Sequence, residues 1–406
     1  MRSFTAEWVV PIHGEPIHHG FITVQDGRIA ALRRHSDAGA DPAAIDLGRA
    51  AIMPALVNAH THLELSHLRG VIPPTGRFLD WIRAIMAMRR EYPDPGDARI
   101  IDAAHAAIVE ARSSGTGLIG DISNTLVTPQ LLREARVPAQ VFYELLGFNA
   151  GDPESMTREA RAKADAAASP DGTVRVGLAP HAPYSVSPGL FAAIRADLDA
   201  HPGHVSSVHL GESPEEMEFI RRGTGPWRAL LEELGVWTGA WEPPGTSPVE
   251  YLERLGFLDR RVLAVHGVQL AGDDLDRLRS LDMTVVACPR SNRYVGVDSP
   301  PLEAFYAMNV NVAFGTDSLA SVQDLNLFSE LAEARRIAPR VPARSLLESA
   351  TLCGARALGF GDEYGSLEAG KRAHLISIRL PEEVSDVEEY LVGGIEPSAI
   401  TWLDAR

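Results

Sequence analysis

Two histidines, His60 and His62, are separated by one residue and follow the apolar run 51–57. The apolar run predicts a buried strand, and side chains two residues apart on a strand point to the same side. Two imidazoles at one strand end can chelate a single metal ion, since imidazole is the commonest metal ligand in proteins. The alternative is a chance pair in a chain that holds 14 histidines.

Candidate ligands and proton-transfer groups also follow the other predicted strands. These strands end near Val57, Ile122, Leu145, Leu178, Val208, Val265, Ala287 and Phe314. The polar side chains at or just after the ends include His60, His62, Asp121, Asn124, Glu144, His181, His209, Glu212, His266, Arg290, Asn292 and Asp317. Taken singly, His209 could be a core histidine and Asp317 a helix N-cap. Jointly these readings require several unrelated coincidences, so we interpret the set as one site.

The pattern between residues 55 and 360 alternates strand-like and helical runs. Helices are expected at Leu79–Arg90, Arg99–Ser113, Pro188–Ala200, Asp273–Leu281 and Val322–Ile337. Eight such units predict an α/β protein with a (β/α)8 TIM-type barrel, whose strand carboxyl ends carry the active site. An open doubly wound sheet is the rival, but no Gly-x-Gly-x-x-Gly opens the first unit.

Short strands with turn residues occupy both ends of the chain, among them a hairpin around Asp26-Gly27. We therefore expect residues 1–54 and 361–406 to form one small β-sandwich domain, and residues 55–360 to form the catalytic barrel.

The composition excludes several kinds of partner. The formal net charge of −16 argues against a nucleic-acid polymer, because phosphate binding needs a positive surface. No apolar stretch approaches the length of a membrane span, and the first residues lack the apolar core of a signal peptide. The two cysteines, Cys288 and Cys353, offer no disulfide framework. We expect a cytoplasmic protein.

In this order, His60-Thr-His62, His209, His266, Asp317 and the tail motif 365–371 resemble the amidohydrolase superfamily. The motifs at 209–212 and 288–292 are similar to its purine and nucleoside deaminase branch. The longer contexts 58–66, 289–292 and 315–321 are similar to the aminodeoxyfutalosine deaminases of menaquinone biosynthesis. One departure is His374, where the small domain of the family usually carries an aspartate.

The resemblance implies a metal-dependent hydrolytic deaminase with a homodimer as its assembly. Binuclear members bridge two metals with a carboxylated lysine after the fourth strand, whereas this chain has His181 there and only Lys163 and Lys371 elsewhere. A bridge through Glu144 remains the alternative to a single ion.

The ligand set and the roles follow from the resemblance together with general metal chemistry. One divalent ion would be held by His60, His62, His209 and Asp317. Zinc suits three nitrogens and one oxygen, although iron(II) or manganese would also accept them. Glu212, His266 and Asp317 would be the catalytic residues: Glu212 protonates the ring nitrogen, while the other two orient water and take its proton.

The substrate would be a small aminopurine nucleoside, with 6-aminodeoxyfutalosine first and adenosylhomocysteine, methylthioadenosine or adenosine as alternatives. Candidate substrate contacts are Glu64, His181, Arg290 and Asn292. An ion pair at the barrel rim is the alternative for Arg290. Trp237 and Trp241, in an irregular insertion over 231–251, are expected either as a lid or as core. Other functions left open are hydrolysis of a cyclic amide or chloro-triazine, and a non-catalytic scaffold. His105, His201, His204 and His374 are expected in solvated or structural roles.

Overall fold

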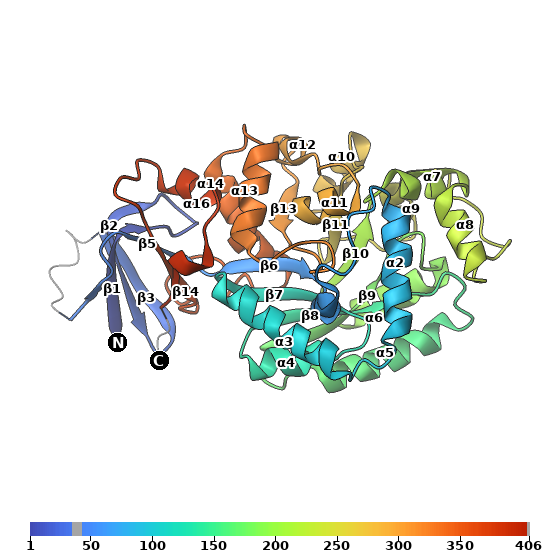
Figure 1. Ribbon diagram of the computed structural model, residues 1–406, viewed down its shortest axis with the longest axis horizontal. Helices are drawn as coiled ribbons and strands as arrows, with labels where there is room; N and C mark the ends of the chain where they lie inside the picture. The colour runs from blue at the N-terminus through green and yellow to red at the C-terminus, as the bar shows by residue number, and fades with distance from the viewer. Residues whose placement is uncertain (35–42, 404–406) are drawn as a thin grey trace.

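The computed structural model describes residues 1–34 and 43–403. Strands from both parts of the predicted small domain form a single seven-stranded sheet (Figure 1). Its strands are β1 (Arg2–Val9), β2 (Ile17–Gln25), β3 (Arg28–Arg34), β4 (Ile45–Asp46), β5 (Ala50–Pro54), β14 (Leu375–Arg379) and β15 (Ile400–Trp402). The order is β15-β14-β5-β1-β2-β3, with β4 beside β1. The sandwich that we expected is thus a single sheet here, because alternating polar and apolar residues do not distinguish the two arrangements.

Two pairings explain how this sheet forms. Strands β2 and β3 are joined by Asp26 and Gly27, both with positive φ (51° and 72°), as a tight hairpin turn requires. Strand β14 pairs antiparallel with β5, so that Ile376 lies opposite Met53 and the two ends of the chain meet.

Eight parallel strands, which we call the barrel, follow in the positions that the sequence predicts. They are β6 (Leu56–Thr61), β7 (Thr116–Ser123), β8 (Ala139–Leu145), β9 (Val174–Pro180), β10 (Ser206–Leu210), β11 (Val262–His266), β12 (Thr284–Ala287) and β13 (Asn311–Phe314). Continuous pairing divides them into two four-stranded halves, β6-β7-β8-β9 and β10-β11-β12-β13.

The two halves meet at two seams. At one, the backbone amide of Asp317 donates to the carbonyl of His60 (3.0 Å), and the side chain of Asn58 bonds to Thr316 (2.8 Å). At the other, the amide of His209 donates to the carbonyl of His181 (2.9 Å). Each seam is therefore closest where predicted site residues lie.

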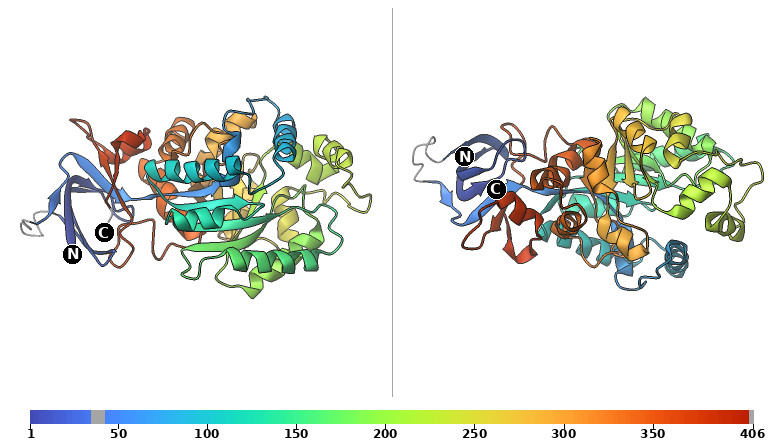
Figure 2. Two further views of the ribbon diagram at one scale, coloured as in Figure 1. Left: turned by 60° about the horizontal axis from the view of Figure 1, so that its bottom comes forward. Right: turned by 90° about the horizontal axis from the view of Figure 1, so that it is seen from above.

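Helices cover the outside of the barrel (Figures 1 and 2). They are α2 (Phe78–Glu91), α3 (Ala98–Ser113), α4 (Thr128–Glu134), α5 (Pro153–Ala167), α6 (Pro188–Ala200), α7 (Pro214–Arg222), α8 (Pro226–Glu233), α9 (Pro248–Arg254), α10 (Asp273–Ser280), α11 (Pro289–Val295), α12 (Leu302–Ala307), α13 (Leu327–Ile337), α14 (Ala343–Glu348), α15 (Gly354–Ala357) and α16 (Val387–Val392). Short helical turns occur at η1 (Leu63–Leu68), η2 (Ser349–Cys353) and η3 (Pro397–Ala399).

Several helix starts repeat one local signal, a capping side chain followed by proline. Asp152, Ser187, Ser213 and Ser247 each accept a hydrogen bond from a backbone amide of the first turn. Helix α13 begins at Leu327, later than predicted, because Asn326 caps it. The insertion 231–251 is irregular between α8 and α9, which take its two ends.

Strand β6 leaves the small sheet and runs toward the opposite end of the molecule, where α2, α7 and α8 lie (Figure 1). The carboxyl ends of the barrel strands therefore face away from the small sheet. No helix in the described ranges has the length and apolar character that crossing a membrane would take.

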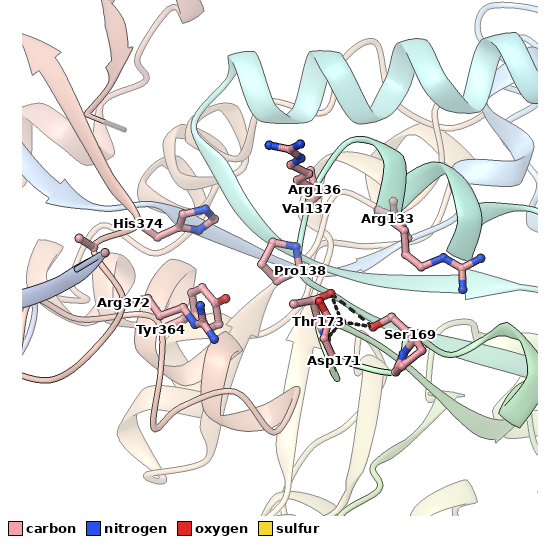
Figure 3. A pocket seen from close by; sticks show the side chains of 14 residues that line it. Arg133, Arg136, Val137, Pro138, Ser169, Asp171, Thr173, Tyr364, Arg372 and His374 are labelled. Atoms are coloured by element: carbon pink, nitrogen blue, oxygen red, sulfur yellow. Dashed lines mark hydrogen bonds between the residues drawn. The ribbon is translucent and has the colours of Figure 1, made fainter. Parts of the chain in front are cut away.

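A cavity of about 720 Å³ lies between the small sheet and the amino-terminal ends of β8 and β9 (Figure 3). Arg136 and Pro138 face it from the barrel side, and Tyr364, Arg372 and His374 from the other. None of the predicted metal or catalytic residues lines it. This cavity is thus separate from the predicted chemistry.

Candidate active site

A second cavity, of about 220 Å³, opens at the carboxyl ends of the barrel strands. Its titratable wall brings together His62, Glu144, His181, His209, Glu212, His266 and Asp317. Its opposite wall is apolar and aromatic, with Phe78, Trp81, Ile82, Ile85, Tyr184 and Trp227. Although this cavity is the smaller of the two, the gathering of seven titratable groups makes it the candidate active site.

Three histidines form a cluster at the base of this cavity. One ligand atom each of His60, His62 and His209 lies within 4.8 Å of the others. Asp317 Oδ1 completes the cluster at 3.7 Å from His60 Nε2 and 3.4 Å from His62 Nε2. His60 Nε2 is buried and has no hydrogen-bond partner in the described part of the chain. A buried nitrogen without a partner, beside two more imidazoles and a carboxylate, fits a divalent metal ion.

The charges of the cluster suit ligation as well. Burial lowers the pKa of His60, and it lowers the pKa of His62 to about 3, so both rings are neutral at pH 7. Burial alone would raise the pKa of Asp317, but the nearby imidazoles of His60, His62 and His266 hold it well below its ordinary value. Neutral imidazoles and an ionised carboxylate are the protonation states that metal binding requires.

A backbone carbonyl fixes the orientation of the His209 ring. Its Nδ1 lies 3.0 Å from the carbonyl of His181 and 3.4 Å from Glu144 Oε1. This orients the ring and leaves Nε2 for a metal ion. Burial opposes ionisation of Glu144, but His181, His209 and His62 outweigh it and lower the pKa of this carboxyl to about 2.

Two hydrogen bonds and an unusual backbone conformation position Asp317. Its backbone amide bonds to β6 (3.0 Å), its Oδ2 accepts from the hydroxyl of Ser291 (2.6 Å), and its φ of 57° lies in the left-handed region. His266 also has a positive φ, 75°. Such conformations are rare for residues other than glycine and cluster at functional sites.

Glu212 is the buried acid of the site. Its carboxyl Oε1 lies 3.5 Å from His266 Nε2, and only 5% of the residue is exposed. Burial raises the pKa of Glu212 well above its ordinary value, and the charges of Asp317 and Glu216 add to the rise. The shift favours the protonated form, which is the form that can donate a proton.

A residue that the sequence reasoning missed holds the loop of this acid. The carboxylate of Glu216 accepts from the backbone amides of Gly211 (2.9 Å) and Glu212 (3.0 Å). The sequence could have pointed to Glu216 through the capping-box pattern at 213–216, in which a serine is followed three residues later by a glutamate.

The predicted substrate contacts are divided by the structure. His181 lines the cavity, with Nδ1 2.7 Å from Ser185 Oγ, and burial lowers its pKa to about 4. Asn292 lies behind His266, with its amide nitrogen 3.1 Å from His266 Nδ1, and does not line the cavity. It is placed to hold that ring rather than to touch a substrate.

Arg290 and Glu64 also lie outside the cavity lining, unlike our expectation. Arg290 donates to Asp324 (2.9 Å) and approaches Glu330 (3.7 Å), which is the rim ion pair that the sequence left as the alternative. Glu64 is buried among donors from the loop after β7 and from Arg89. Its carboxylate is saturated, so it has little capacity left for ribose hydroxyls.

The lid interpretation of Trp237 and Trp241 is not what the structure shows. Both rings pack with Phe148 and Phe219, and neither lines the cavity. The aromatic wall comes instead from Trp227, stacked on Tyr184 with ring centroids 3.7 Å apart, and from α2. His105, His201, His204 and His374 lie away from the cavity, as expected.

Comparison with known proteins agrees with this geometry. Residues 51–395 match the model of the amidohydrolase family. The chain belongs to this family. An aminodeoxyfutalosine deaminase of Deinococcus radiodurans is 32% identical over 325 residues, which cover 78% of this chain and 75% of that protein. A 5-methylthioadenosine/S-adenosylhomocysteine deaminase of Moorella thermoacetica is 30% identical over 402 residues, covering 95% and 88%.

Among solved structures, an adenosine deaminase from Xanthomonas campestris with bound zinc superposes with a TM-score of 0.83 at 28% identity, covering 98% of this chain and 90% of that one. Family membership and deaminase relatives make this amidohydrolase a metal-dependent hydrolytic deaminase. No lysine is among the described residues that line the cavity.

Proposed function

We propose that this amidohydrolase removes the exocyclic amine of an aminopurine nucleoside, and that its substrate is 6-aminodeoxyfutalosine. The observation that carries the proposal is a buried glutamate with a raised pKa, Glu212, beside a cluster of four metal-ligand candidates. The substrate choice is supported by the 32% identity to the aminodeoxyfutalosine deaminase, which would place the reaction in menaquinone biosynthesis. The reaction adds water across an amidine carbon and releases the oxo purine and ammonia.

The cluster of His60, His62, His209 and Asp317 is proposed to hold one zinc ion, with iron(II) or manganese as substitutes. The chemistry that such an ion supplies is acidification of water, from a pKa near 16 to about 7. A homodimer is proposed as the assembly.

The proton movements are assigned to residues of the chain. Glu212 donates its proton to the ring nitrogen next to the reacting carbon, which relieves the negative charge that develops there. His266 and Asp317 face the same space, orient the attacking water and accept its proton. That proton then passes to the leaving amine, and as ammonia departs the remaining hydroxyl proton returns to Glu212, which leaves the oxo purine and regenerates the acid.

The aromatic wall excludes water and stacks on planar rings. Trp227 and Tyr184 lie parallel, with an interplanar angle of 17°, and Phe78 and Trp81 extend the apolar surface. A purine or a benzoyl ring fits such a surface because offset stacking stabilises aromatic pairs. His181 is a neutral polar group on this wall and is proposed to contact the base.

Ammonia release from a panel of nucleosides tests the proposal. We expect the highest kcat/KM for 6-aminodeoxyfutalosine, with lower values for adenosylhomocysteine, methylthioadenosine and adenosine. Strong turnover of adenosylhomocysteine with none of 6-aminodeoxyfutalosine would overturn the substrate choice.

Deamination of methylthioadenosine or adenosylhomocysteine is the second candidate function. It is favoured by the longer match, 95% of this chain, to the Moorella thermoacetica deaminase. Hydrolysis of a chloro-triazine or cyclic amide is the remaining candidate, and near-normal purine turnover in Glu212→Gln would favour a proton route other than the one assigned to Glu212.

A further inference from the structure

Helix α2 forms one wall of the active-site cavity, and a single charged side chain interrupts its apolar surface. Ile82, Ile85, Met86 and Arg89 all line the cavity. Their spacing of three, four and seven residues places them on one face of the helix. Among the described residues lining the cavity, Arg89 is the only arginine or lysine. An arginine in an otherwise apolar wall points to a ligand with a negative group.

Glu64 holds this arginine in place. Arg89 Nη2 donates to Glu64 Oε1 at 3.0 Å. The same carboxylate accepts from the hydroxyls of Ser123 (2.9 Å) and Thr125 (2.7 Å) and from the backbone amides of Asn124 and Thr125. Because four other donors fix Glu64, the guanidinium is oriented before any ligand arrives.

Arg89 keeps donors for a ligand. The described residues provide a hydrogen-bond partner for its Nη2 only, which leaves Nε and Nη1. Its side chain is 37% exposed, against 5% for Glu64.

The other arginines near the barrel mouth are already engaged. Arg290 is shared between Asp324 and Glu330 and does not line the cavity. Arg83, one helical turn and a half before Arg89, makes two hydrogen bonds of 3.0 and 3.1 Å from one nitrogen to Glu233.

We propose that Arg89 binds a carboxylate at the end of the nucleoside's 5′ substituent, and that the Glu64–Arg89 pair thereby selects carboxylate-bearing aminopurine nucleosides over neutral ones. This assignment rests on the proposed deamination of an aminopurine nucleoside. The reacting purine then lies against the metal-ligand cluster, and the substituent runs along the aromatic wall to α2. Nη2 gives one of its two hydrogens to Glu64, so its second hydrogen, together with the neighbouring Nε–H or Nη1–H, can form a paired, charge-assisted contact with one carboxylate.

The test compares Arg89→Met with Arg90→Met in the metal-loaded enzyme. Arg90 is the neighbouring, exposed residue of α2 and does not line the cavity, so it is the matched control. The substrates are 6-aminodeoxyfutalosine and adenosylhomocysteine, which carry carboxylates, and methylthioadenosine, which does not. Arg89→Met is expected to lower kcat/KM for the carboxylate-bearing substrates by about 10- to 100-fold, mainly through KM. Its kcat/KM for methylthioadenosine is expected to stay within about threefold of wild type.

Two outcomes would overturn the inference: an equal loss for all three nucleosides, or no loss for any. The wild type could also turn over adenosylhomocysteine but not 6-aminodeoxyfutalosine. If Arg89→Met then lowers kcat/KM for adenosylhomocysteine and not for methylthioadenosine, Arg89 is supported as the carboxylate site while the proposed substrate is rejected. The two failures are thus distinguishable in one experiment.

Discussion

At the scale of single residues, the site depends on the protonation state that each environment imposes. Glu212 is buried beside other carboxyls, which raises its pKa and favours its protonated form, whereas Asp317 is buried among histidines, which lower its pKa. Two carboxyl groups on the same cavity thus acquire opposite roles, acid and ligand, from their surroundings alone.

Replacing Glu212 with glutamine removes the acid while conserving shape. We expect kcat for purine deamination to fall by about 10²- to 10⁴-fold, as loss of general acid–base catalysis usually does. Metal content, measured by elemental analysis, should remain at the wild-type level because Glu212 is outside the proposed ligand set. A variant with wild-type kcat would remove Glu212 from the mechanism.

His181 should make the folded state sensitive to acid. Its pKa falls from 6.5 to about 4 on folding, so only the unfolded chain binds its proton between these pH values. The stabilisation is present above pH 6.5 and is lost as pH falls toward 4, by about 2 kcal/mol at pH 5. Urea unfolding of metal-free wild type and His181→Asn at pH 7.5 and 5 measures it. The wild type should lose this amount relative to the variant; an equal difference at both pH values would contradict the shift.

The sequence predicted these residues unevenly. His60, His62, His209 and Asp317 were predictable because strand ends converge in a parallel barrel. Ser291 was not, because neighbours on α11 point about 100° apart and only the three-dimensional start of that helix shows which one faces Asp317.

At the scale of elements, the two seams between the barrel halves create the metal-ligand cluster. Strand β13 approaches β6 closely enough for its amide to bond to His60. The element boundaries were predictable from apolar runs and capping residues, but the function of α2 was not. An apolar stripe at helical spacing looks the same whether it covers a core or a cavity.

Gly315 permits the close approach of β13 to β6. A Cβ at this position would lie 2.7 Å from both Cβ and the carbonyl oxygen of His60. We expect Gly315→Ala to reduce the free energy of unfolding by about 2–3 kcal/mol and to weaken metal binding. Gly203, with open space around its Cα, provides the control Gly203→Ala. Chemical denaturation and metal titration of both variants measure these effects. Equal stability of the two variants would contradict the requirement for a close approach of β13 to β6 at Gly315.

At the scale of the whole molecule, the small sheet lies at one end of the barrel and helices α7 and α8 lie at the other (Figure 2). The pairing of β5 with β14 joins the ends of the chain, as the repeated turn signals at both ends suggested. The sequence pattern could not predict whether these strands form a sandwich or a single sheet, because the outcome depends on which strands pair with each other across long distances in the sequence.

Metal removal should affect the stability of the molecule as a whole. A ligand that binds only the folded state adds about 2.7 kcal/mol when its free concentration is a hundred times Kd. Chelation is therefore expected to lower the Tm of the wild type, and added zinc to restore it. In His209→Asn, zinc should no longer raise the Tm, whereas the exposed His105→Asn should behave like wild type. An unchanged Tm after complete removal of metal would contradict ligation by the cluster.

The most direct test of the central claim, hydrolytic deamination at this metal-ligand cluster, is turnover of 6-aminodeoxyfutalosine in H₂¹⁸O by the zinc-loaded enzyme, read by mass spectrometry. The account predicts one ¹⁸O atom in each oxo-purine product, one ammonia released per product, and no product from His209→Asn. A product without the label, or equal turnover by His209→Asn, would contradict it.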